Sequence, residues 1–253
     1  MSAAHPFTQH PYRCRLERGR HGTREAALRG DILVIVDTLS FSTAAATAVH
    51  HGATIYPCAR GDDRHAIARH IGGEATVARQ DVPAKGRFSL SPLTYLNLQP
   101  GTRIVVASPN GATCSRYARD VPQLLVGALV NARAVADILT HLLDKADRCI
   151  TVIACGERWV PSTEDGDLRV AIEDDLGAGA ILSCLDMDKS PEARACEGAF
   201  LRLKDHLAEI LRGCGSGREL REVGFAGDVD HASQLDLYDA VPVMRGERLE
   251  RFR

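Results

Sequence analysis

A carboxylate and several hydroxyls follow directly after a run of strongly apolar residues. Asp37 comes after residues 32–36, and Ser40, Ser42 and Thr43 come next. A short Val- and Ile-rich run without polar alternation predicts a parallel strand buried on both faces, and ligands bind at the carboxyl ends of such strands in open α/β sheets. Ser and Thr can also cap a following helix, whose free backbone N–H groups attract anions. We therefore expect an anion-binding site beside Asp37.

Two further predicted strands end in small or polar residues of the same kind. Ser108, Asn110 and Gly111 follow one strand, and residues 155–157, Cys-Gly-Glu, follow another. Because the carboxyl ends of parallel strands meet at one edge of a sheet, we expect these segments to join Asp37 there. A plain type I turn followed by a helix cap explains the first segment equally well.

Three consecutive acids, Glu173, Asp174 and Asp175, precede a segment of small residues that predicts a helix. Acids in a first helical turn complement the helix dipole and need no ligand. Mg²⁺, however, takes oxygen ligands from one or two carboxylates and keeps waters that a phosphate can displace. Both interpretations stand, and in the second Glu173 and Asp174 hold Mg²⁺ together with Asp37.

Short apolar runs alternate with helical patterns along the chain. Apolar residues recur at helical spacing after Asn131 and again over residues 191–211. This alternation predicts the α/β class, with a mostly parallel sheet covered by helices on both sides. The predicted strands cover residues 33–36, 53–56, 75–78, 103–107, 124–126 and 149–154.

Two segments are rich in Pro, Gly and charged residues. Residues 80–100 are predicted to form a long loop or lid, and residues 157–173 a second loop between the last central strand and a helix. Loops of this length in a compact domain are often functional.

The chain has 253 residues, of which 45% are hydrophobic and 25% charged, and a formal net charge of −2. This length suits one α/β domain over residues 1–253, with two closely packed lobes as the alternative. The charge balance does not indicate nucleic acid or a membrane as a partner. The eight cysteines lack zinc spacing, and no run suggests a signal peptide or a membrane span. We therefore expect reduced thiols in a cytoplasmic protein.

A series of short segments carries a family resemblance. They are residues 34–43 (Val-Ile-Val-Asp-Thr-Leu-Ser-Phe-Ser-Thr), 52–53, 90–92, 108–111, 131–132, 155–157, 173–174, 177–179 and 216–217, followed by Leu220, Gly224, residues 228–229, Asp236 and residues 241–242. No single segment is specific. In this order they resemble the 2-phosphosulfolactate phosphatase (ComB) family over nearly the whole chain.

The resemblance implies a magnesium-dependent phosphatase with a layered α/β/α fold and a mostly parallel or mixed sheet. Its reaction would convert (R)-2-phospho-3-sulfolactate to 3-sulfolactate and phosphate in coenzyme M biosynthesis. The partner would be a small phosphorylated acid, and a homodimer stays open. The residues that we assign are Asp37, Asn110 and Glu173 for catalysis, Asp37, Glu173 and Asp174 for the metal, and Ser40, Ser42, Thr43, Ser108 and Gly111 for phosphate.

The chain departs from the family at the same strand end. The family motif Asp-Val-Leu-Arg-Ala-Ser-Thr has an arginine where this chain has Ser40, and an alanine where it has Phe41. The family's Gly-Asn-Ser-Pro is replaced by Ser-Leu-Ser-Pro at residues 89–92, which removes an amide. A guanidinium that could hold phosphate or sulfonate in a fork is thus missing at residue 40. We hypothesise that Arg87 or Arg158, in the two predicted loops, supplies a replacement cation.

The leading hypothesis is therefore a magnesium-dependent phosphatase for a small phosphorylated hydroxy acid. In it Asp37 is either a metal ligand or the nucleophile. A hydrolase of the same fold with another phosphorylated substrate is one alternative, because Ser40 and Phe41 form a bulkier and less cationic corner than Arg-Ala. A non-catalytic anion-binding homologue is the other, because both the arginine and the amide are lost.

Overall fold

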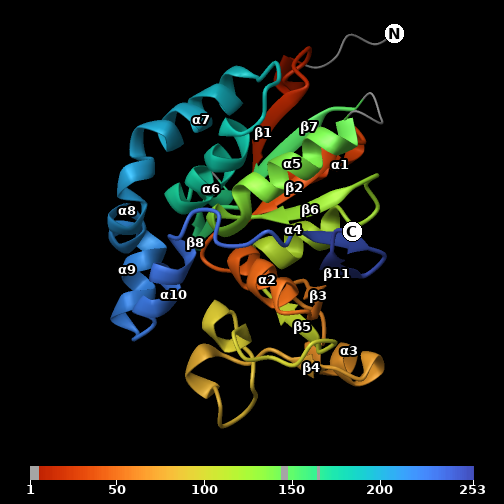
Figure 1. The fold of residues 1–253 in the computed structure, drawn as a ribbon, viewed down its shortest axis with the longest axis vertical. Coiled ribbons are helices and arrows are strands. Elements are labelled where there is room, and N and C mark those ends of the chain that lie inside the picture. Colours follow the sequence, from red (N-terminus) through yellow and green to blue (C-terminus); the bar gives the residue numbers. More distant parts are fainter. Residues whose placement is uncertain (1–5, 144–147, 164–165) are drawn as a thin grey trace.

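Helices and strands alternate along most of the chain, as the sequence predicts. The computed structural model describes residues 6–143, 148–163 and 166–253 (Figure 1). The strands are β1 (Cys14–Arg18), β2 (Ile32–Val36), β3 (Thr54–Cys58), β4 (Glu74–Ala75), β5 (Arg103–Ala107), β6 (Leu124–Gly127), β7 (Ile150–Ala154), β8 (Glu157–Thr163), β9 (Gly166–Arg169), β10 (Pro242–Arg245) and β11 (Arg248–Arg251). The α-helices are α1 (Gly19–Leu28), α2 (Phe41–His50), α3 (Arg64–Ile71), α4 (Gly111–Tyr117), α5 (Ala132–Leu143), α6 (Ile172–Ser183), α7 (Pro191–Leu203), α8 (Leu207–Gly213), α9 (Gly215–Glu222) and α10 (Ala226–Ala232).

The central sheet has nine strands in the order β1-β7-β2-β6-β10-β11-β3-β5-β4. Strands β1, β7, β2 and β6 form one parallel block, and β3, β5 and β4 form a second. The antiparallel pair β10 and β11 lies between the blocks. The predicted α/β class with a mostly parallel sheet flanked by helices is confirmed, and the sheet is mixed.

The sheet curls strongly where its two blocks meet. Strand β10 pairs with β6 only through Val243 and Leu125, and β11 pairs with β3 only through Leu249 and Ile55. In a flat sheet, the five strand spacings from β2 to β5 would separate these strands by about 24 Å. The Ser108 hydroxyl after β5 nevertheless lies 3.2 Å from the Asp37 carboxylate after β2. The curl therefore brings the carboxyl ends of both blocks together.

Strand β2 is buried on both faces, which explains its unbroken apolar sequence. Ile32, Val34 and Val36 belong to a core that includes residues of α5, α6 and α7. Leu33 and Ile35 belong to a second core formed with α1, α2 and α4. Figure 1 shows α5 and α6 beside this part of the sheet, with α7 to α10 continuing along the edge of the molecule.

Several predicted elements differ from the structure. The segment after β7 is not a loop, because β8 and β9 pair as a separate antiparallel ribbon. Its apolar residues Trp159 and Leu168 are exposed, so they do not mark a buried face by which the sequence could reveal these strands. Residues 80–100 do lack long regular elements, with 3₁₀ turns at Arg79–Asp81 and Pro92–Tyr95. Strand β1, helix α1 and the β10–β11 hairpin were not predicted.

In the described part of the chain, no helix combines the length and apolar character needed to cross a membrane. All eight cysteines carry free thiols.

A substitution at Gly177 of α6 can test the close contact between this helix and the end of β2. A Cβ atom there would lie 2.6 Å from Thr38 Oγ1 and 2.9 Å from Val36 Cγ1. We expect Gly177→Ala to lower the free energy of unfolding by about 1–3 kcal/mol in urea denaturation. Gly198→Ala is the control, because Gly198 lies at an exposed position of α7 where a Cβ would meet no atom within 4 Å, and the substitution should raise stability by up to about 1 kcal/mol. Equal effects of the two substitutions would contradict the close contact.

Candidate functional site

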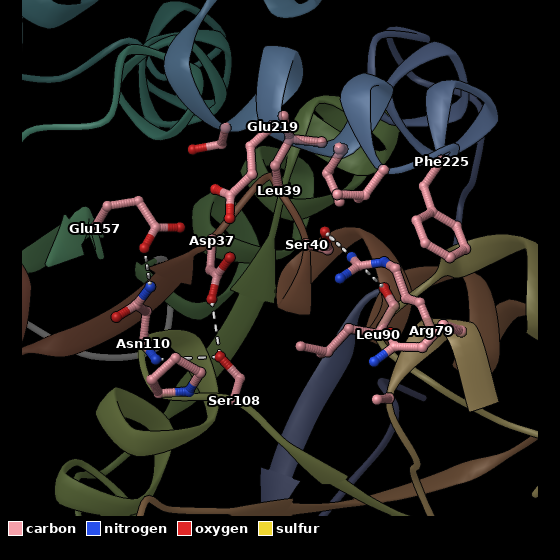
Figure 2. Close-up of a pocket in the computed structure, with 16 residues that line it drawn as sticks. Asp37, Leu39, Ser40, Arg79, Leu90, Ser108, Asn110, Glu157, Glu219 and Phe225 are labelled. Atoms are coloured by element: carbon pink, nitrogen blue, oxygen red, sulfur yellow. Dashed lines mark hydrogen bonds between the residues drawn. The ribbon is translucent and has the colours of Figure 1, made fainter. Parts of the chain in front are cut away.

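A pocket of about 330 Å³ opens where the ends of β2 and β5 meet (Figure 2). A volume of this size suits a small metabolite. Four of the predicted site residues line the pocket, namely Asp37, Ser40, Ser108 and Asn110. The other charged residues of its lining are Arg79, Glu157 and Glu219.

Asp37 is fixed by three hydrogen bonds from two segments. Its Oδ2 atom accepts from the Gly111 backbone N–H at 2.7 Å and from the Ser108 hydroxyl at 3.2 Å. Its Oδ1 atom accepts from the Phe41 backbone N–H at 3.2 Å. Burial raises the pKa of Asp37, these hydrogen bonds oppose that rise, and the charge of Glu173 adds to it. The carboxylate is thus rigidly held, but burial of its negative charge is energetically unfavourable.

Asp174 connects the ends of two central strands. Its carboxylate accepts from the Thr38 N–H at 2.7 Å and from the Gly156 N–H at 2.8 Å. Burial raises its pKa well above the ordinary value, and the charges of Asp37 and Glu173 raise it further. Asp174 therefore has a structural function at the strand ends, whatever else it binds.

Glu173 lies beside Asp174 at the start of α6 and is 2% exposed. Its Oε1 atom is buried and accepts no hydrogen bond from the described residues. No group of three or more His, Cys, Asp or Glu side chains in the described segments is arranged to hold a metal ion. Asp37, Glu173 and Asp174 therefore lie within electrostatic reach of one another without forming a complete ligand set.

Glu157 lies across the pocket from Ser40, on the same side as Asn110 (Figure 2). The Asn110 Nδ2 atom donates to Glu157 Oε2 at 3.0 Å. Burial, followed by the charge of Asp37, raises the pKa of Glu157 to about 7. A carboxyl group with this pKa can donate or accept a proton near neutral pH.

Arg79 is the cationic residue in the described lining of the pocket. Its Nη2 atom donates to the Ser40 hydroxyl at 2.6 Å and to the Leu90 carbonyl at 3.3 Å. Its Nε atom donates to Asp228 at 2.9 Å. A guanidinium thus lies beside residue 40, where the family motif led us to look for a cation.

The remaining predicted residues lie outside the pocket lining. The Ser42 hydroxyl accepts from the Asp37 N–H and donates to a β2 carbonyl, and Thr43 donates to the Thr38 carbonyl. Both hydroxyls therefore stabilise the turn, because a tight strand-to-helix connection leaves backbone groups that need partners. The Gly111 N–H is likewise used by Asp37.

The two arginines proposed as replacement cations are not brought to this pocket. Arg87 forms an ion pair with Glu74, and its side chain is 59% exposed. Arg158, on β8, has a pKa lowered first by partial burial and then by the nearby charges of Arg20 and Arg60. Neither arginine is part of the pocket lining.

The sequence held signals for the residues that we did not assign. Glu157 ends the Cys-Gly-Glu segment after β7, and this position at a strand end was already a reason to assign it a function. Asp228 lies in one of the segments that carry the family resemblance. Arg79 directly follows a predicted strand, but its contact with Asp228 depends on the tertiary fold.

Comparison with known proteins identifies the family. The profile described as 2-phosphosulpholactate phosphatase matches residues 20–247. A probable 2-phosphosulfolactate phosphatase of Carboxydothermus hydrogenoformans is 32% identical over 216 residues, which cover 83% of this chain and 84% of that protein. A protein of the same description from Gloeobacter violaceus is 30% identical over 84% of this chain and 87% of its own length. The chain therefore belongs to the 2-phosphosulfolactate phosphatase family.

Proposed function

We propose that the protein is a magnesium-dependent phosphatase that hydrolyses a small phosphorylated hydroxy acid in the cytoplasm. Membership of the family suggests (R)-2-phospho-3-sulfolactate as the substrate. Its hydrolysis yields 3-sulfolactate and phosphate in coenzyme M biosynthesis. The observation that supports this proposal most is the fixed Asp37 carboxylate beside Glu157 in a small pocket. Such a pair can divide the work of hydrolysis, because one group stays charged while the other exchanges a proton.

The residues present suit a magnesium ion. Asp37 and Glu173 offer carboxylate oxygens, and the buried Oε1 atom of Glu173 lacks a hydrogen-bond partner in the described residues. The charge of Glu173 raises the pKa of Asp37, and the charges of Asp37 and Glu173 raise the pKa of Asp174; a cation between these carboxylates would relieve both effects. Mg²⁺ needs only one or two carboxylates, because waters and substrate phosphate complete its coordination.

We assign Asp37, with Glu173, to holding the metal. When bound, Mg²⁺ neutralises phosphate oxygens and lowers the pKa of a coordinated water. The three hydrogen bonds to Asp37 stabilise its negative charge and so reduce its nucleophilicity, which favours this assignment over direct attack on phosphorus. Ser108, which lines the pocket, keeps the Asp37 carboxylate oriented.

Glu157 is assigned to proton transfer. In its protonated form it can donate to the alkoxide oxygen that leaves phosphorus, and Asn110 holds its carboxyl group in place. The pKa of about 7 keeps a large protonated fraction at neutral pH.

The loss of an arginine at residue 40 was one reason to consider a non-catalytic homologue. Arg79 weakens that argument, because its guanidinium donates to the Ser40 hydroxyl and lines the same pocket. The other alternative, a phosphatase with a different phosphorylated substrate, is still supported by Ser40 and Phe41 in place of the family's Arg-Ala.

The first test is phosphate release from a panel of phosphorylated carboxylic and sulfonic acids, with Mg²⁺ and with EDTA. We expect turnover only with Mg²⁺, and a loss of at least about 10³-fold in kcat/KM for Asp37→Asn, because the metal loses its main charged ligand. Asp120→Asn removes an equally charged but exposed side chain and should match wild type. Binding of phosphorylated acids without any turnover would favour the non-catalytic homologue.

A second test follows the proton that Glu157 carries. Because the protonated form is the active one, kcat/KM should fall as the pH rises through the pKa of Glu157. Glu157→Gln should lower the rate by about 10²-fold or more and remove this alkaline limb, whereas Glu222→Gln at the exposed end of α9 should keep it. If the limb persists in Glu157→Gln, another group donates the proton.

A third test measures the free energy of unfolding as a function of pH and of added Mg²⁺. In metal-free protein the raised pKa of Glu157 gives stability that is complete below about pH 4.5 and is lost as the pH rises through about 7. The loss attributable to Glu157 is up to about 3 kcal/mol in urea denaturation with EDTA, and Glu157→Gln should lack it.

Saturating Mg²⁺ should stabilise wild type at pH 7 but not Asp37→Asn. Equal stabilisation of both proteins would exclude Asp37 as a ligand.

A further inference from the structure

The Arg79 guanidinium is held from one side and open on the other. Asp228 accepts from Nε, and the Ser40 hydroxyl and the Leu90 carbonyl accept from Nη2. Within the described residues, Nη1 donates to no acceptor. The side chain is 17% exposed and lines the pocket, so Nη1 is the group left for a ligand.

The support behind Arg79 is rigid. Asp228 is 1% exposed, and its second carboxylate oxygen accepts from the Ser91 hydroxyl at 2.5 Å. The Phe225 ring lies 5.9 Å from the guanidinium carbon. A buried carboxylate that pairs with arginine lets the guanidinium stay in one orientation, which lowers the entropy cost of binding an anion there.

The pocket is polarised along its length. Figure 2 shows Asp37 with Glu157, Asn110 and Ser108 on one side, and Arg79 with Ser40 and Leu90 on the other. The acid side suits a phosphoryl group with its metal, as proposed above. A second anionic group of the same small molecule would then meet the Nη1 atom of Arg79, whose positive charge and N–H donors suit a carboxylate or sulfonate oxygen.

We propose that Arg79, positioned by Asp228 and Ser91, binds the non-reacting acid group of the substrate and makes the enzyme select phosphorylated acids over neutral phosphomonoesters. The inference rests on the proposed phosphatase function, because that function places the phosphoryl group beside Asp37. Arg79 is a specificity residue, and Asp228 is a positioning residue that acts through it.

The test compares 2-phospholactate with its methyl ester, which keeps the phosphoryl group and loses the carboxylate charge. Wild type with Mg²⁺ should prefer the acid by about 10²-fold in kcat/KM. Arg79→Met should lower kcat/KM for the acid by a similar factor, mainly through KM, and leave the ester within about threefold. Arg79→Lys should restore part of the preference, because it keeps the positive charge but loses the several N–H donors that hold the guanidinium in place.

The control residue, Arg212, lies in α8 and pairs with α10, the helix that also carries the positioning residue Asp228. Arg212 pairs through its Nε atom with Asp230 at 2.7 Å, as Arg79 pairs with Asp228, but it lies outside the pocket. Arg212→Met should therefore leave both substrates unchanged. Asp228→Asn should lower the preference for the acid less than Arg79→Met does, with folding checked by thermal unfolding.

The outcomes separate this inference from the proposed function. If Arg79→Met lowers both substrates equally, or if the preference survives, Arg79 is not the acid anchor, although the phosphatase function stands. If wild type hydrolyses neither compound, calorimetry with the same pair decides the question. Acid-selective binding that Arg79→Met abolishes would uphold the anchor alone, and binding of neither compound by wild type would overturn it.

Discussion

The hydrogen bonds from the Gly111 amide and the Ser108 hydroxyl to Asp37 join two strands that lie far apart in the sheet order. They are possible only because the sheet curls at the β10–β11 hairpin. Gly111 must lack a side chain, because a Cβ atom there would lie 2.5 Å from the Phe41 ring and 2.8 Å from Asp37. The contact that completes the fold is thus the same contact that fixes the candidate catalytic carboxylate.

The buried acids impose an electrostatic cost on this arrangement. Asp174 connects the ends of β2 and β7 through two backbone N–H groups, while burial and the charges of Asp37 and Glu173 raise its own pKa. Backbone hydrogen bonds offset part of the desolvation of Asp37 and Asp174, but Glu173 Oε1 receives no such help from the described residues. The uncompensated negative charge therefore lowers the stability of the strand ends and gives these carboxylates an affinity for protons or cations. Such destabilised charges are common at functional sites.

The sequence was sufficient to predict the elements whose signals are local. The apolar run of β2 identified a buried strand and hence the position of Asp37 at its end, and the acids from residue 173 identified the start of α6. The hydroxyls of Ser42 and Thr43 were assigned to phosphate, but whether a hydroxyl faces a ligand or a backbone group depends on the geometry of the turn. In the β8–β9 ribbon the apolar residues Trp159 and Leu168 are exposed, so they do not mark a buried face that a sequence period could reveal.

Arg79 shows why the cationic side of the pocket could not be predicted from the sequence. Its partners Ser40 and Asp228 are 39 and 149 residues away in the chain, so no local pattern links them. The Ser40 hydroxyl accepts from Arg79 at 2.6 Å, whereas an arginine at residue 40 would remove this acceptor and bring a second positive charge to the same point. The departure from the family motif and the position of Arg79 are therefore one feature. A small acceptor at residue 40 gives the guanidinium a hydrogen-bond partner at the pocket, which Arg79 reaches from the 3₁₀ turn at Arg79–Asp81.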